Sequence, residues 1–330
     1  MKGRVALVTG GGRGIGREAA LLLSLGNLAM TDQLSEAPHY LQSALQIFTR
    51  LGDLHGCALA LSALAFFDRT RGNCRQASAR YKQALQDCRR CGERIGEIHV
   101  LGSLAQIEMD WDHFDEARRL LDEASVLCGT LKAPRAIAQT EHRLAELYLR
   151  MGAYTFAERS FSSALAMVRN GGDLVGEAYA LTGLGVIRTL RGQYSLAEPD
   201  LSAAFGITRY MPRNLVHGRV LLSLAELHLV RGDHRNAGAV IAEGLITFSE
   251  TRSALVMRAR LLEAKARIEE LAGNPSAADA ARREALGLSG DADPALSMAL
   301  TEALGPLHPP GSPEVPVSPK AVPGQPPLGV

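Results

Sequence analysis

Alanine and leucine recur along this chain at a fixed spacing of 40 residues. Three registers share that period, and they are occupied by Ala37, Ala77, Ala117, Ala157, Ala197 and Ala237, by Leu64, Leu104, Leu144, Leu184 and Leu224, and by Ala44, Ala84, Ala124, Ala164 and Ala204. A period of about 20 to 50 residues is typical of repeat proteins, in which each unit packs mainly against its neighbours. The pattern therefore predicts an array of similar units.

Each unit contains two stripes of apolar residues with helical spacing. Between residues 144 and 165 these stripes are Leu144, Leu147 and Tyr148, then Ala157, Phe161, Ala164 and Leu165. Residues three or four positions apart lie on one face of a helix. A helix pair of this kind cannot bury its apolar faces alone, so neighbouring pairs are expected to stack. The small alanine side chains should let the two helices of a pair approach closely.

Glycine marks the turns of the same frame. One set occupies Gly72, Gly152, Gly192 and Gly232, with Gly273 one residue late and Asp112 in the remaining slot. Glycine, and less often asparagine or aspartate, adopts the left-handed conformation that follows the end of a helix. This set is therefore predicted to end helices. A second turn is expected where one unit meets the next, with Gly56, Gly96 and Gly176 in register.

The count of units predicts an all-α fold, a right-handed superhelical solenoid of about seven antiparallel helix pairs. We expect three segments: a glycine-rich arm at residues 1–24, the helical repeats at 25–288 and a tail at 289–330. Nine prolines fall between Gly305 and Val330, a composition typical of disordered chain.

These repeats resemble the tetratricopeptide repeat. The resemblance rests on Leu25 and Gly26, on the Gly-x-Tyr of Gly152 and Tyr154, and on the Ala-x-x-x-Phe-x-x-Ala that begins at Ala157. The period of 40 is longer than the family's usual spacing of about 34 residues. The proline that normally closes the second helix is absent. Long repeats of this kind are similar to those in the C-terminal halves of multidomain bacterial transcriptional activators.

The resemblance implies a non-catalytic scaffold that binds a protein or peptide in a concave groove, as the sensing or autoinhibitory part of a bacterial regulator. First helices line the inner face of such a solenoid. Counting from the leucine ladder then predicts these groove positions: Phe66, Arg69, His99, Gln106, Met109, Gln139, His142, Glu146, Tyr179, Val186, Arg219 and Glu226. Their mixed character favours an amphipathic helix or an extended peptide as the ligand.

A different motif stands at the N-terminus. Residues 5–16 read VALVTGGGRGIG, which resembles the nucleotide-binding start of short-chain dehydrogenases. That resemblance implies that Gly10, Gly14 and Gly16 let the backbone approach a dinucleotide pyrophosphate. The alternative function is therefore a truncated NAD(P)-binding oxidoreductase. No later strands follow to complete a parallel sheet, and no tyrosine stands in the family's Tyr-x-x-x-Lys spacing, so we expect no cofactor and no enzyme activity.

Composition narrows the classes of partner. The net formal charge is +1, so direct binding to nucleic acid is not expected. No apolar run reaches the roughly 18 residues of a membrane span. The five cysteines are an odd number, which favours free thiols in the cytoplasm. Cys88 and Cys91 lack the two further ligands that a structural zinc ion needs, so no metal site is expected.

Overall fold

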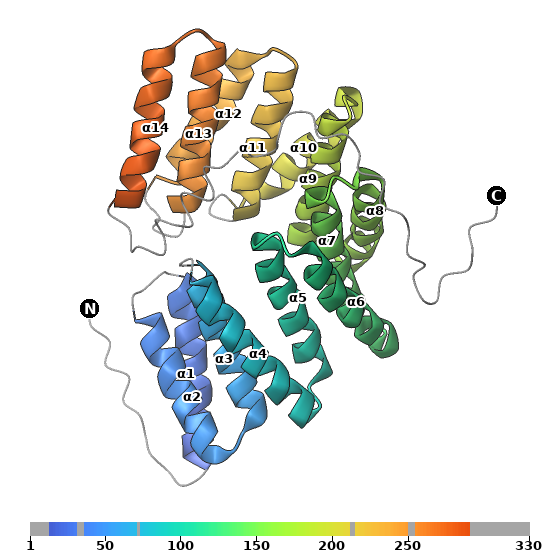
Figure 1. Cartoon of the computed structure of the whole chain (residues 1–330), viewed down its shortest axis with the longest axis vertical. Helices are drawn as coiled ribbons and strands as arrows, with labels where there is room; N and C mark the ends of the chain where they lie inside the picture. The colour runs from blue at the N-terminus through green and yellow to red at the C-terminus, as the bar shows by residue number, and fades with distance from the viewer. Residues whose placement is uncertain (1–12, 32–35, 71–72, 212–214, 250–254, 291–330) are drawn as a thin grey trace, which may run out of the picture.

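The computed structural model describes residues 13–31, 36–70, 73–211, 215–249 and 255–290. Every regular element within these ranges is an α-helix (Figure 1). In chain order the helices are α1 (Arg13–Thr31), α2 (Ala37–Leu51), α3 (Leu54–Thr70), α4 (Cys74–Cys91), α5 (Arg94–Asp110), α6 (Phe114–Leu131), α7 (Pro134–Arg150), α8 (Tyr154–Gly171), α9 (Leu174–Leu190), α10 (Tyr194–Thr208), α11 (Leu215–Val230), α12 (His234–Thr247), α13 (Leu255–Leu271) and α14 (Pro275–Gly290).

Consecutive helices form pairs, from α1 with α2 to α13 with α14, and each pair packs on the next. The first helices of successive pairs also contact one another, whereas the second helices make no comparable contacts within the described part of the chain. Figure 1 shows the pairs following one another in a curved stack. The first helices therefore line its inner, concave side. This arrangement confirms the predicted all-α solenoid of about seven helix pairs.

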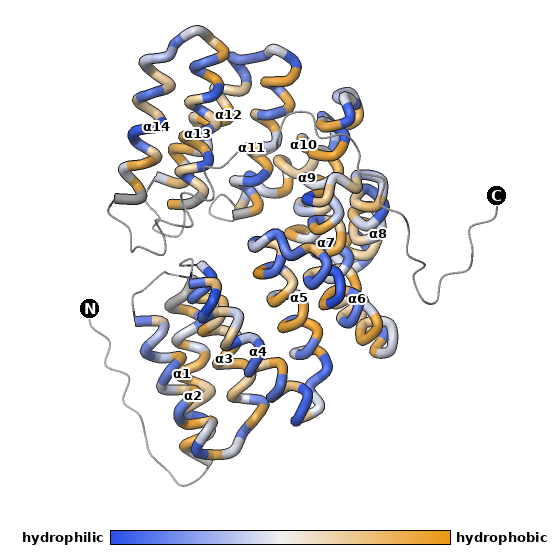
Figure 2. Tube along the Cα trace, in the orientation of Figure 1, coloured by the Kyte–Doolittle hydropathy of each residue, from blue (hydrophilic) through white to orange (hydrophobic). Residues whose placement is uncertain are grey.

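The three ladders form the core of the stack. The alanines of both alanine registers are 0% exposed, and the leucines from Leu64 to Leu224 are at most 9% exposed. Burying one leucine side chain contributes roughly 1.5–3 kcal/mol, so the leucine ladder holds each pair to the next. Figure 2 shows apolar and polar residues alternating along the helices, as expected where only one side of each helix is buried.

The turns within the pairs follow the predicted glycine set. Gly152, Gly192, Gly232 and Gly273 have φ values of +72° to +80°, and Asp112 in the remaining slot has φ +59°. Each follows the end of a first helix, which confirms their role as helix terminators. Gly72 lies outside the described residues.

The second predicted turn is present where one unit meets the next, and other glycines than those in register make it. Gly52, Gly92 and Gly172, not Gly56, Gly96 and Gly176, adopt positive φ there. Gly176 lies inside the first turn of α9, where its amide donates to the Asp173 side chain at 3.0 Å. A Cβ at Gly176 would stand 2.8 Å from Val168. Glycine at this register therefore serves the close approach of two helices, and the turn is made four residues earlier.

The first helix begins earlier than the predicted repeat boundary. We placed that boundary between residues 24 and 25, whereas α1 runs from Arg13 to Thr31 and packs on α2. Ala19 in its middle is fully buried. The predicted start of the tail at residue 289 stands close to the end of α14 at Gly290, and residues 291–330 lie outside the described residues.

Gly183 in α9 gives a test of this close packing. A Cβ at Gly183 would stand 2.3 Å from the Phe161 ring, which is 1% exposed and enclosed by its neighbours. We expect Gly183→Ala to lower the free energy of unfolding by about 1 to 2 kcal/mol, because the added methyl group overpacks the interface. Chemical denaturation followed by circular dichroism measures this loss.

Gly238 in α12 is the matched control, since nothing lies within 4 Å of a Cβ added there. Gly238→Ala should raise the free energy of unfolding by up to about 1 kcal/mol through helix propensity alone. Equal effects of the two substitutions would contradict the packing argument.

Candidate binding groove

A hollow on the concave side lies where α5, α7 and α9 meet. It measures about 480 Å³ and opens to solvent. Pockets of roughly 300–1,000 Å³ are typical of ligand sites. Six of the predicted groove residues line it, namely His99, Gln106, Gln139, His142, Glu146 and Tyr179.

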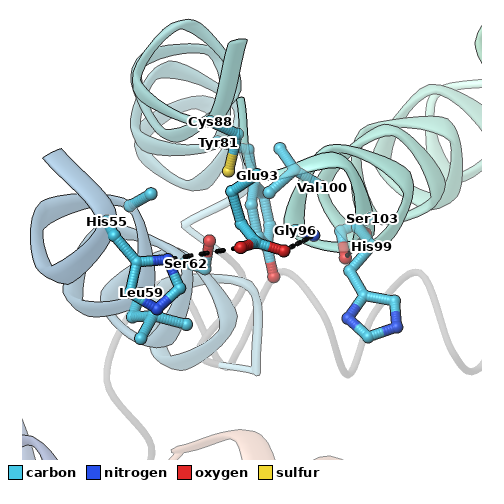
Figure 3. A pocket seen from close by; sticks show the side chains of 11 residues that line it. His55, Leu59, Ser62, Tyr81, Cys88, Glu93, Gly96, His99, Val100 and Ser103 are labelled. Carbon is cyan, nitrogen blue, oxygen red and sulfur yellow. Dashed lines mark hydrogen bonds and ion pairs between the residues drawn. The ribbon is translucent and has the colours of Figure 1, made fainter. Parts of the chain in front are cut away.

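A smaller hollow of about 140 Å³ adjoins the first. Figure 3 shows His55 and Leu59 of α3, Tyr81 of α4 and Val100 of α5 around it. Its walls are more apolar than those of the larger hollow, and Leu59 is 45% exposed. Because His99 and Ser103 line both hollows, the two lie next to each other, and together we call them the groove.

Tyr179, Glu146 and Arg219 form a hydrogen-bonded group that joins three first helices. The Tyr179 hydroxyl donates to Glu146 Oε2 at 2.6 Å. Arg219 Nη1 donates to the Tyr179 hydroxyl at 3.1 Å and lies 3.6 Å from Glu146 Oε1. Burial alone would raise the pKa of Glu146, but the charge of Arg219 and the hydrogen bond from Tyr179 outweigh it, so the pKa is lowered. Glu146 is therefore an ionised carboxylate held inside the groove.

Arg150 and Asp110 continue this network toward α5. Arg150 Nη2 lies 3.2 Å from Asp110 Oδ1, and Arg150 Nη1 donates to the Met109 carbonyl at 3.1 Å. Arg69 of α3 lies 3.9 Å from the other oxygen of Asp110. Side chains of α3, α5, α7, α9 and α11 are thus connected across the concave face.

His142 is buried beneath the larger hollow and is neutral at physiological pH. It is 8% exposed, and its ring centroid lies 5.2 Å from that of Tyr179 and 6.4 Å from that of Phe161. Burial lowers the pKa of His142 to about 4. Nε2 of this ring has no hydrogen-bond partner among the described residues. The imidazole therefore offers a polar atom below the groove without adding charge.

The other predicted groove residues lie along the same face. Arg219 contacts Glu146 and Tyr179, as described above, and Glu226 pairs with Arg267 of α13 at 2.8 Å. Phe66 is 45% exposed on α3 beside Arg69, whose guanidinium carbon lies 5.8 Å from the ring centroid. Val186 is half-buried on α9 and lines neither hollow.

Met109 was predicted to face the groove, and this prediction is wrong. Its side chain is 0% exposed and belongs to the core between α5 and its neighbours. The inner stripe of α5 runs through His99, Ser103 and Gln106, so the next position on it is Asp110. Met109 points about 100° away from that stripe, toward the helices packed around α5.

Three arginines of the concave face were not predicted: Arg143, Arg150 and Arg260. Arg143 shares the register of Ser103, and Arg150 shares that of Asp110. Arg260 falls in the register of Tyr179 and Arg219 once the last unit is counted as one residue longer. Gly273 already carried that one-residue shift, so this signal was available in the sequence.

The described residues offer few groups suited to catalysis or metal binding. No cluster of three or more His, Cys, Asp or Glu side chains suited to a metal ion occurs among the described residues. Burial raises the pKa of Cys88 to about 11, which keeps the thiol protonated and a poor ligand or nucleophile. Of the helices described, none is long and apolar enough to cross a membrane.

The dehydrogenase-like motif falls mostly outside the described residues, which begin at Arg13. Gly14 and Gly16, expected to approach a pyrophosphate in the alternative function, lie within α1. The described ranges contain no strand to which a dinucleotide site could be attached.

Comparison with known proteins supports the repeat assignment. Residues 136–209 match the family model of the tetratricopeptide repeat. No curated protein sequence matches the chain.

Among solved structures, the chain is similar to a Rap protein complexed with Competence and Sporulation Factor, with a TM-score of 0.67, 16% identity and coverage of 87% of this chain and 76% of that one. It is also similar to a tetratricopeptide repeat protein from Parabacteroides merdae, with a TM-score of 0.53, 17% identity and coverage of 87% of this chain and 99% of that one. A third similar structure is BtubC from P. vanneervenii, with a TM-score of 0.53, 16% identity and coverage of 74% of this chain and 97% of that one. Residues 136–209 therefore match the tetratricopeptide-repeat family model, and the helix pairs of the chain share the fold of solved tetratricopeptide-repeat structures.

Proposed function

We propose that this chain is a non-catalytic scaffold that binds a protein or peptide along its concave face. The observation that carries the proposal is the pair of neighbouring hollows over α3, α5, α7 and α9, which share His99 and Ser103. Both hollows combine apolar walls with hydrogen-bonding groups, as a peptide with mixed side chains requires. The Rap structure with Competence and Sporulation Factor supports a ligand-binding role for this fold.

A bulky substitution in the groove tests the proposal. Peptides would be selected from a random twelve-residue library on the full chain, and their affinity measured by fluorescence anisotropy. Gln139 is exposed and lines the larger hollow, so Gln139→Trp should block it and weaken binding at least about tenfold. The matched control is Gln83→Trp, since Gln83 is exposed on α4, a second helix of a pair. Selected peptides that bind Gln139→Trp as tightly as the wild type would refute the groove as the binding surface.

The 40-residue period supports a narrower proposal, that the chain is the sensing part of a bacterial transcriptional regulator in the cytoplasm. A sensor must change shape when its ligand binds, because a ligand acts only through different affinities for two states. Small-angle scattering should then show the solenoid tightening when a selected peptide is added. An unchanged scattering curve at saturating peptide would count against sensing and leave peptide binding intact.

A further inference from the structure

The concave face carries more positive than negative charge. Arg69, Arg143, Arg150, Arg219 and Arg260 lie on or beside it, and Glu93, Asp110, Glu146 and Asp173 are the carboxylates among them. Arg267 and Glu226 neutralise one another at 2.8 Å. Five guanidinium groups against four carboxylates leave one positive charge in excess.

Arg143 is one of two arginines in this set that have no acidic partner. Its guanidinium lies flat on α5, where a Cβ at Gly102 would stand 1.9 Å from Arg143 Nη1. It lines the larger hollow and makes no ion pair among the described residues. Burial lowers the pKa of Arg143, which is the sign of a cation without enough compensating charge.

Arg260 is the second. Its Nε is buried and has no hydrogen-bond partner within the described ranges. Burial lowers the pKa of Arg260, the charges of Arg219 and Arg150 lower it further, and the carboxylates of Asp110 and Glu146 offset only part of this lowering. Three first helices, α7, α11 and α13, therefore bring like charges together. A buried cation held beside other cations is unfavourable unless an anion offsets it.

Glu146 shows which anion fits among these arginines. Its carboxylate accepts from Tyr179 and lies within 4.0 Å of both Arg219 and Arg150. A carboxylate is thus already accommodated by part of the cluster, and charge-assisted hydrogen bonds to guanidinium are among the stronger ones. A local excess of one positive charge suits a single carboxylate better than the repeated phosphates of a nucleic acid.

We propose that the ligand of the groove is an acidic peptide, in which a side-chain carboxylate binds among Arg143, Arg219 and Arg260. A neighbouring apolar side chain enters the smaller hollow beside Leu59 and Tyr81, because His99 and Ser103 line both hollows. This inference rests on the proposed peptide-binding function and specifies the chemistry of its ligand.

Peptide selection on the full chain tests the ligand chemistry. Peptides from the random twelve-residue library should be enriched in aspartate or glutamate next to an apolar residue. Replacing the acidic residues of the tightest peptide by their amides should weaken it about 10- to 100-fold, because charged hydrogen bonds are lost. Its affinity should also fall as salt is raised.

Substitutions in the protein locate the carboxylate. Arg143→Gln and Arg260→Gln should each weaken the acidic peptide about tenfold and leave the amide peptide unchanged. Arg235→Gln is the control, since Arg235 is exposed on α12, outside the groove. Circular dichroism checks that each variant is folded. If one arginine variant does not fold, the other still tests the position of the carboxylate.

Each other outcome has one meaning. Neutral or basic peptides that Gln139→Trp still blocks would overturn the acidic preference and leave the groove function standing. Acidic peptides unaffected by both arginine substitutions would overturn the assigned position of the carboxylate. A single-stranded oligonucleotide that binds more tightly than every selected peptide would replace the peptide by nucleic acid. If no selected peptide is blocked by Gln139→Trp, both proposals fail.

Discussion

The Phe161→Ala variant is expected to lose about 3 to 5 kcal/mol of its free energy of unfolding, the range for a large aromatic side chain in a core. Phe161 is 1% exposed and packs between α8 and α9, where it fills the space left by Gly183. The His142 and Tyr179 rings lie with their centroids 6.4 and 6.3 Å from its own. Truncation therefore leaves a cavity directly below the groove.

Urea denaturation followed by circular dichroism measures this loss. Because a solenoid unit contacts only its neighbours, weakening the fourth of seven pairs should also separate the unfolding of the two halves and broaden the transition. Phe156 on the same helix is the matched control: it is 40% exposed, and its ring centroid lies 5.4 Å from that of Tyr148. Phe156→Ala should cost no more than about 1.5 kcal/mol. Equal losses in the two variants would contradict the central role of Phe161.

The repeat ladders were enough to predict the fold because they mark contacts that every unit makes. Residues such as Ala157 and Leu144 face the same neighbours in each pair, so packing selects the same residue types every 40 positions. The left-handed turns at Gly152 and Gly192 could be predicted for the same reason, since their backbone conformation restricts the choice of residue.

Glycines inside helices could not be assigned from the pattern. Gly176 and Gly152 recur in the same way, yet one allows two helices to approach and the other makes a turn. The difference depends on Val168, a residue of the neighbouring helix. Met109 was misplaced for a related reason: a one-residue error in a helix rotates the side chain by about 100°, which is enough to exchange groove for core.

The arginine cluster depends on the curvature of the stack. Arg150 and Arg260 are 110 residues apart in sequence, and neither carries a local motif. Their charges interact only because the first helices curve around one concave face. The position of a groove residue within a unit was therefore predictable, whereas its partners from distant units were not.

Glu146→Gln is expected to lower the free energy of unfolding by about 3 kcal/mol, the lower end of the range for breaking a buried ion pair. The carboxylate side chain is 13% exposed, but its partners Arg219 and Arg150 are 40% and 36% exposed, so solvent screens part of the interaction. Glutamine keeps the size of the side chain and one acceptor for Tyr179. What it removes is the negative charge that offsets the surrounding arginines.

Acid should reduce the difference between Glu146→Gln and the wild type. The folded pKa of Glu146 is lowered, so its contribution to stability is complete above the unfolded value of about 4.3 and is lost as the pH falls through the folded value. Urea titrations at pH 7 and near pH 3 measure this change. Glu226→Gln is the control in the same register, because its pair with Arg267 is exposed and worth at most about 1 kcal/mol. A Glu146→Gln loss no larger than that of Glu226→Gln at pH 7 would show that the arginines of the concave face are not held together by this carboxylate.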